Sequence, residues 1–178
     1  RWNFVSIASA GADQVSSLGV WALFVAIAVF GASGNAVYAQ IGGLTTIAFA
    51  SSLIFSKLYG ALIDRRRGGL LLRSSAIANS AVYVLRPFVS TPLGVVLINI
   101  VNEAFTSGYN MPYLKGQFDM ADRLPGYRIV YMTLMEVSLS LGAMVGAMVM
   151  CVLAYGFGDV RGLQLGFVAM AVLVLPIM

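Results

Sequence analysis

The sequence contains no histidine, a single cysteine and few charged residues. Without histidine, catalytic Ser-His pairs, imidazole proton relays and His-ligated metal sites are excluded. The lone Cys151 has no second cysteine with which to form an intramolecular disulfide. Charged residues make up 10% of the chain, against about 25% in a soluble domain. Hydrophobic residues make up 60% and the mean hydropathy is +0.88, so we expect an integral membrane protein in contact with membrane lipid.

Several functional classes lack their motifs in this sequence. A GxxxxGK phosphate loop is absent, which argues against nucleotide-driven transport. Neither an Asp-rich DGxxAR array of lipid phosphotransferases nor the three Pro-and-acid repeats of mitochondrial carriers is present. The cations lie between apolar runs rather than along one stripe, so no nucleic-acid partner is expected. We therefore expect no enzymatic reaction, no cofactor and no metal.

Six apolar runs are each long enough to cross about 30 Å of hydrocarbon, which takes roughly 20 helical residues. They span about residues 4–30, 37–63, 70–89, 93–116, 127–154 and 160–178. Short segments rich in Gly, Pro, Asp and Arg separate them. The pattern predicts one all-α domain over residues 1–178, with six transmembrane helices and each helix antiparallel to the next.

The positive charges predict the orientation, because cytoplasmic loops are rich in Lys and Arg. With the turn after the second run in the cytoplasm, only Arg86 and Arg161 lie outside. The nine cations on the cytoplasmic side are Arg1, Lys57, Arg65, Arg66, Arg67, Arg73, Lys115, Arg123 and Arg128. Both ends of the chain are then cytoplasmic, and we expect residence in a bacterial inner membrane.

The turn after the second run, GALIDRRRGG at residues 60–69, resembles a signature of the major facilitator superfamily of transporters. That signature places Gly, three residues, Asp, a basic residue, any residue, Gly and two basic residues in order. Gly60, Asp64 and Arg65 match in place, whereas Arg67 stands where Gly is expected and two glycines stand at the basic pair. Six runs with this turn resemble one six-helix half of such a transporter.

The resemblance implies alternating access, with a small-molecule substrate bound between two six-helix halves. The second half is then either another copy of this chain or a missing part of its parent chain. Asp119 and Arg128, beside the second long cytoplasmic turn, are implied to join the motif residues in a cytoplasmic gate. The alternative is that they belong to a solvated charged loop. The first, second, fourth and fifth helices of each half approach the central cavity in this family, and the third and sixth are more peripheral.

Three carboxylates lie where charge is costly, near the centre of a predicted span. Asp13, Glu103 and Glu136 fall about nine or ten residues into the first, fourth and fifth runs. At about 1.5 Å per residue each lies roughly 14–15 Å deep, where secondary transporters bind substrate and coupling ions. We interpret Glu103 and Glu136 as proton or substrate groups. The structural alternative is that each acid is neutral or hydrogen-bonded and holds helices together.

Polar residues near these acids complete the predicted substrate and proton site. They are Gln14, Gln40, Asn99, Asn102 and Asn110. Asn102 and Asp13 are predicted to be supporting contacts. The function that follows is a secondary transporter moving a small solute, and our hypothesis is that this movement is coupled to protons. The alternatives are a six-span channel and a membrane scaffold that transports nothing.

Three further features bear on helix geometry. Pro112 is expected to weaken the fourth helix and free a carbonyl near Gly108, which either binds a ligand or only shapes packing. Arg86, near the outer end of the third run, is expected to extend to the membrane interface, and the alternative is that it pairs with one of the three acids. Small residues recur every fourth position at Ser138, Gly142 and Gly146, a pattern typical of close helix packing.

Overall fold

The computed structural model describes residues 2–31, 36–64 and 68–177, and within them every regular element is helical. The all-α prediction is therefore confirmed. The elements form six consecutive helical rods. They are α1 (Trp2–Val15) continued by η1 (Ser16–Val20), α2 (Trp21–Phe24) and η2 (Val25–Val29); α3 (Ala36–Asp64); α4 (Gly68–Leu85) with η3 (Arg86–Phe88); α5 (Pro92–Asp122); α6 (Arg128–Phe157); and α7 (Asp159–Leu173) with η4 (Leu175–Ile177).

Four of these rods are long and apolar enough to cross a membrane. They cover Asn3–Val29, Ala39–Ile63, Arg128–Phe157 and Asp159–Ile177. The chain thus has the helices of a membrane protein. The other two rods, α4 and α5, are not among them. α4 has only 18 residues and includes Arg73 and Asn79, and α5 carries many polar groups.

Local sequence determines where the helices begin and end. Thr91 precedes α5 in an extended conformation, and its hydroxyl accepts a hydrogen bond from the main-chain N–H of Gly94 at 3.2 Å. Pro92 follows as the first helical residue, where its missing N–H costs no helix hydrogen bond. Gly158 separates α6 from α7 with a φ of 85°, a left-handed conformation that favours glycine.

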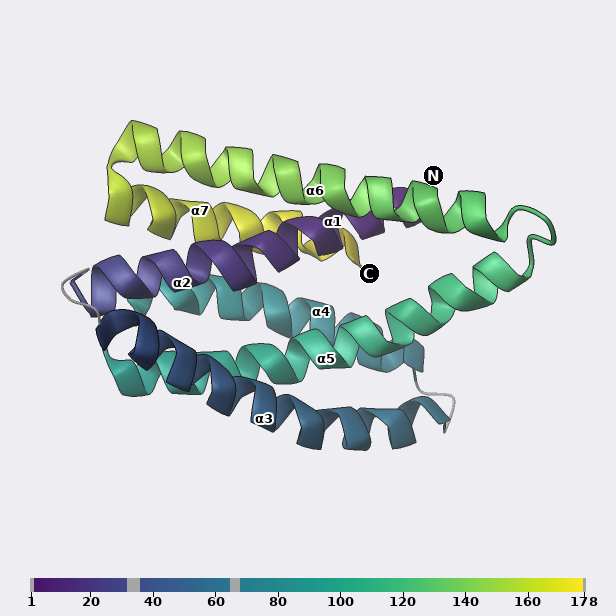
Figure 1. Cartoon of the computed structure of the whole chain (residues 1–178), viewed down its shortest axis with the longest axis horizontal. Helices are drawn as coiled ribbons and strands as arrows, with labels where there is room; N and C mark the ends of the chain where they lie inside the picture. The colour runs from purple at the N-terminus through teal and green to yellow at the C-terminus, as the bar shows by residue number, and fades with distance from the viewer. Residues whose placement is uncertain (1, 32–35, 65–67, 178) are drawn as a thin grey trace.

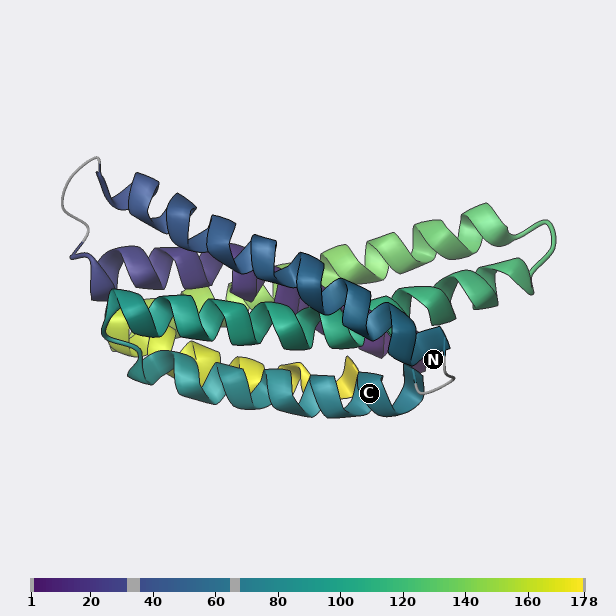
Figure 2. The ribbon, with the colours of Figure 1, turned by 90° about the horizontal axis from the view of Figure 1, so that it is seen from below.

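The rods run alternately up and down the bundle. Figure 1 shows both termini toward the end of the bundle that carries the α5–α6 turn, with the α6–α7 turn at the opposite end. At about 1.5 Å per residue, the 31 residues of α5 extend for roughly 46 Å, longer than a membrane is thick. The end of α5 and the start of α6 accordingly project beyond the other helices (Figure 2).

The closest packing joins α1 to α6, and small residues make it possible. A Cβ atom added to Gly142 would collide with the main chain of Ala8, and one added to Gly11 with the main chain of Leu139. A Cβ atom on Gly146 would lie 3.0 Å from the Cα atom of Ala12. The predicted stripe of small residues is confirmed at its two glycines, where it sets α6 directly against α1.

The aromatic core lies between the first rod, α4 and α7. The ring of Phe167 makes edge contacts with Trp21 and Phe24, at centroid distances of 5.8 and 5.5 Å, and a tilted contact with Tyr83 at 6.4 Å. All four side chains are buried. This core fixes α4 against α1 and α7, and with it the polar residues that α4 carries.

Candidate functional site

A buried carboxylate lies at the centre of the most extensive polar network in the described part of the chain. Asp13 of α1 is 2% exposed. One of its oxygens accepts a hydrogen bond from Nδ2 of Asn79 at 2.8 Å, and the other accepts one from the hydroxyl of Tyr109. The hydroxyl of Tyr83 donates to the main-chain oxygen of Asp13 at 3.1 Å. Asp13 therefore connects α1 to both α4 and α5.

Arg86 lies buried beside this network, with 1% of its surface exposed. Its Nη2 donates to Oδ1 of Asn102 at 2.7 Å and to Oγ of Ser17 at 3.0 Å. Its guanidinium carbon lies 4.3 Å from the ring centroid of Tyr83 and 5.1 Å from that of Trp21, close enough for cation–π attraction. The prediction that Arg86 extends to the membrane interface is wrong. Its side chain turns inward, because the core offers hydrogen-bond acceptors and aromatic faces.

The two groups are joined by Ser17 and Tyr83. Ser17 lies one helical turn after Asp13, and its Oγ is 2.9 Å from the hydroxyl of Tyr83. The same Oγ accepts from Arg86, so a continuous path of hydrogen bonds links the guanidinium to the main chain of Asp13. Ser17 belongs to the π-helical turn η1. Such turns often occur at functional sites, because they change which side chains face a neighbour.

A cleft of about 430 Å³ opens between α1, α5 and α6, bordered on α3 by Phe49. Asp13 lies at its buried base, while Glu103 is half-buried and Glu136 is exposed. The cleft brings together six of the eight predicted substrate and proton residues. They are Asp13, Gln14, Asn102, Glu103, Asn110 and Glu136. The three carboxylates predicted near the membrane centre, which lie between positions 13 and 136 of the sequence, thus share one cavity.

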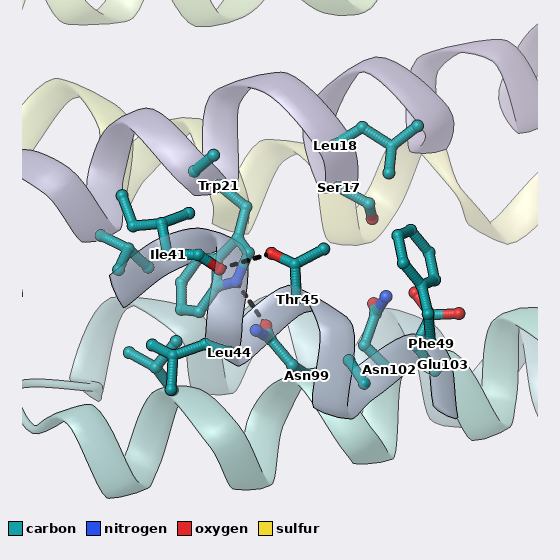
Figure 3. A pocket seen from close by; sticks show the side chains of 14 residues that line it. Ser17, Leu18, Trp21, Ile41, Leu44, Thr45, Phe49, Asn99, Asn102 and Glu103 are labelled. Carbon is teal, nitrogen blue, oxygen red and sulfur yellow. Dashed lines mark hydrogen bonds between the residues drawn. The ribbon is translucent and has the colours of Figure 1, made fainter. Parts of the chain in front are cut away.

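A smaller pocket of about 60 Å³ adjoins this cleft, between the first rod, α3 and α5. Asn99 lines it, and its Oδ1 accepts a hydrogen bond of 2.6 Å from Nε1 of Trp21 (Figure 3). Asn102 and Glu103 line both cavities. Gln40 is exposed near the start of α3 and lines neither cavity. Seven of the eight predicted residues are therefore at the two adjoining cavities.

The helix α5 continues through Pro112 without a break. Gly108, one turn earlier, is buried where α5 packs on α4, and a Cβ atom there would collide with the hydroxyl of Ser75. The pair thus serves the contact between α4 and α5. Pro112 also lines a groove beside the start of α4, together with Gly68 and Lys115.

Only part of the predicted cytoplasmic gate is described. Arg65 and Arg67 lie outside the described residues, as does the side chain of Asp64, while Gly60 lies in the last turns of α3 with open space beside it. Asp119 lines a groove with the end of α3 and the start of α4. Arg128 pairs with Asp122 at 3.2 Å rather than with Asp119, and both partners are exposed. The groove brings α5 next to the motif.

Sequence reasoning missed the partners that α4 contributes. Asn79, Tyr83 and Arg86 follow one another at intervals of four and three residues, so they share one helical face. That spacing was a readable signal, because polar and aromatic groups on one face of an apolar helix need partners. The third run was instead interpreted as peripheral. Tyr109 was missed because tyrosine is common in membrane helices and carries no charge.

Comparisons with protein-family models, with curated proteins and with solved structures give no match. The cleft and the packing of the helices therefore carry the functional argument.

Proposed function

We propose that the chain is a six-span unit like one half of a major facilitator transporter, and that it moves a small solute by alternating access. The observation that carries this proposal is the cleft, in which Asp13, Glu103 and Glu136 from three helices face one cavity halfway along the bundle. Acids are costly in lipid and usually mark substrate or ion paths. No chemical step is involved, so the protein is not an enzyme.

The six-span count is supported by how α4 and α5 lie in the bundle. Both run alongside the four apolar rods rather than across their ends (Figure 1). α5 packs on α3 and α4, and α4 packs also on α7. Rods that run alongside four membrane-length neighbours are expected to cross the same membrane. On α5, the polar residues Asn102, Glu103 and Asn110 line the cleft. Both termini are then on one side. The nine-to-two distribution of cations supports the cytoplasm as that side, and we propose a bacterial inner membrane as the location.

The pattern of contacts supports an internal repeat of three helices. If each of the first three rods is matched in order with one of the last three, the contact between α1 and α6 corresponds to the contact between α5 and α3, and both contacts are present. In the same way the contact between α3 and α4 corresponds to the contact between α6 and α7. The contact between α4 and α7 corresponds to itself. An odd number of spans per repeat makes the repeats inverted, and such 3+3 repeats lie within each facilitator half.

The cleft is one wall of a transport cavity, and a second six-helix half completes it. That half is a second copy of this chain or another part of its parent chain. Glu103 and Glu136 are the groups that exchange protons or bind substrate, since they are the two carboxylates of the cleft to which no side chain donates among the residues that the structure describes. Asp13, held by its two donors, positions α4 and α5 around them.

The test is proton movement in proteoliposomes that contain the purified chain and a trapped pH dye. Solutes of each charge class are added in turn, and we expect one class to move protons with a rate that saturates. Glu103→Gln combined with Glu136→Gln should abolish this movement, whereas Asp159→Asn, an exposed acid of α7, should leave it unchanged. Unchanged proton movement in the double variant would show that the coupling assignment is wrong. Unsaturable ion current would identify a channel instead.

A further inference from the structure

We propose that the cleft binds amphipathic organic cations, an inference that rests on the proposed function for how such a ligand reaches the cleft. The charge of the lining is the first observation. Three carboxylates line the cleft, and no Lys or Arg does among the described residues. Arg86 is buried behind it and bonded to Asn102 and Ser17. The three carboxylates outnumber the single guanidinium behind the cleft, which favours a cation over an anion.

The second observation is the apolar part of the lining. Four aromatic rings and two methionines face the cleft beside the acids. They are Phe49, Tyr109, Tyr113, Phe118, Met132 and Met135. Aromatic faces attract organic cations, and methionine side chains adapt to irregular apolar surfaces. This lining favours a ligand with an apolar body around its charge.

The third observation is the spacing of the acids. Among the residues that the structure describes, no three acidic or other metal-ligating side chains converge closely enough to hold a metal ion. Glu103 and Glu136 instead stand on different helices, α5 and α6, and both line the cleft. A volume of about 430 Å³ lies in the usual range for small-molecule sites, about 300–1,000 Å³. The geometry thus fits a bulky cation better than a compact one.

The experiment compares two probes of nearly the same shape and opposite charge, tetraphenylphosphonium and tetraphenylborate. Binding of each to the purified chain in nonionic detergent is measured by calorimetry, with empty micelles as the baseline. We expect tetraphenylphosphonium to bind at least about tenfold more tightly than tetraphenylborate, because the acids attract one ion and repel the other. Equal affinities, or tighter binding of the borate, would overturn the proposal.

Matched variants locate the site. Glu103→Gln and Glu136→Gln should each weaken tetraphenylphosphonium binding about tenfold, whereas Asp159→Asn should leave it unchanged. Phe49→Leu should weaken the binding about threefold, because one aromatic ring of the lining is lost. Phe157→Leu should leave the binding unchanged, because Phe157 is exposed and lies outside the cleft. If both Glu variants bind as the original chain does, the site is not this cleft.

These tests distinguish a failure of the proposed cation site from a failure of the proposed transport. Tetraphenylphosphonium crosses lipid without a protein, so the readout is proton movement above that of protein-free liposomes. Tetraphenylphosphonium that binds with the expected variant profile but drives no such protein-dependent proton movement would support the site and refute the transporter. Proton movement driven by a neutral or anionic solute, with no preference between the two probes, would support the transporter and refute the cation site.

Discussion

Replacing Asp13 by leucine should destabilise the protein strongly, because it removes the acceptor of two buried donors. Asn79 is 0% exposed and Tyr109 is 3% exposed, so neither can turn to water instead. A buried group left without its partner costs about 1–3 kcal/mol. For the two donors the loss is about 2–6 kcal/mol, and at about 2–4 °C per kcal/mol for a chain of this size Tm falls by about 4–24 °C.

The assay is thermal unfolding of the purified protein in detergent, followed by tryptophan fluorescence, since Trp21 is buried beside the network. Gln14→Leu is the matched control. Gln14 follows Asp13 directly but is exposed, so its replacement should change stability by no more than about 0.5 kcal/mol.

The triple variant Asp13→Leu with Asn79→Leu and Tyr109→Phe separates lost hydrogen bonds from lost packing. Removing the donors together with the acceptor leaves no unpaired polar group among the three side chains, and such exchanges are often nearly neutral. We therefore expect the triple variant to recover most of the Tm that the single variant loses. An unchanged Tm in Asp13→Leu, or a triple variant less stable than the single one, would refute this account of the network.

Three further predictions concern packing and surface contacts. Gly142→Ala should lower stability by about 1–3 kcal/mol through collision with α1. Gly43→Ala is the control, because Gly43 has open space around it, and it should raise helix stability by up to about 1 kcal/mol. Equal Tm values for the two variants would contradict the packing of α6 against α1. Trp21→Phe should cost about 0.5–1.5 kcal/mol, because the hydrogen bond to Asn99 is lost, and an unchanged unfolding curve would count against that bond. Asp122→Asn breaks an exposed ion pair and should change stability by less than about 1 kcal/mol; a larger loss of Tm would show that the pair is less exposed than the structure has it.

The helical rods were predictable because apolar runs and turn residues mark them directly. The largest difference lies at the end of α5, predicted at residue 116 and observed at Asp122. Charged residues there were interpreted as a turn. They are compatible with a helix that projects beyond the bundle, where its side chains are exposed.

The candidate site was predictable only in part. The acids stood out because charge in lipid is costly, and six polar residues chosen on that basis line one cleft. The predicted position of Arg86 at the membrane interface was wrong, because it rested only on how near Arg86 lies to the end of the third apolar run. Depth along one helix does not say whether a neighbouring helix offers acceptors, and Asn102 of α5 does.

The apolar runs were enough to predict an all-helical chain rich in membrane-length helices. Helix hydrogen bonds are local, and lipid leaves a spanning backbone few other ways to satisfy them. Which polar groups meet could be seen only in the folded chain. The bonds from Asn79 and Tyr109 to Asp13 join residues 66 and 96 positions apart. These hydrogen bonds depend on the order, rotation and depth of separate helices. Packing at small and aromatic residues determines all three.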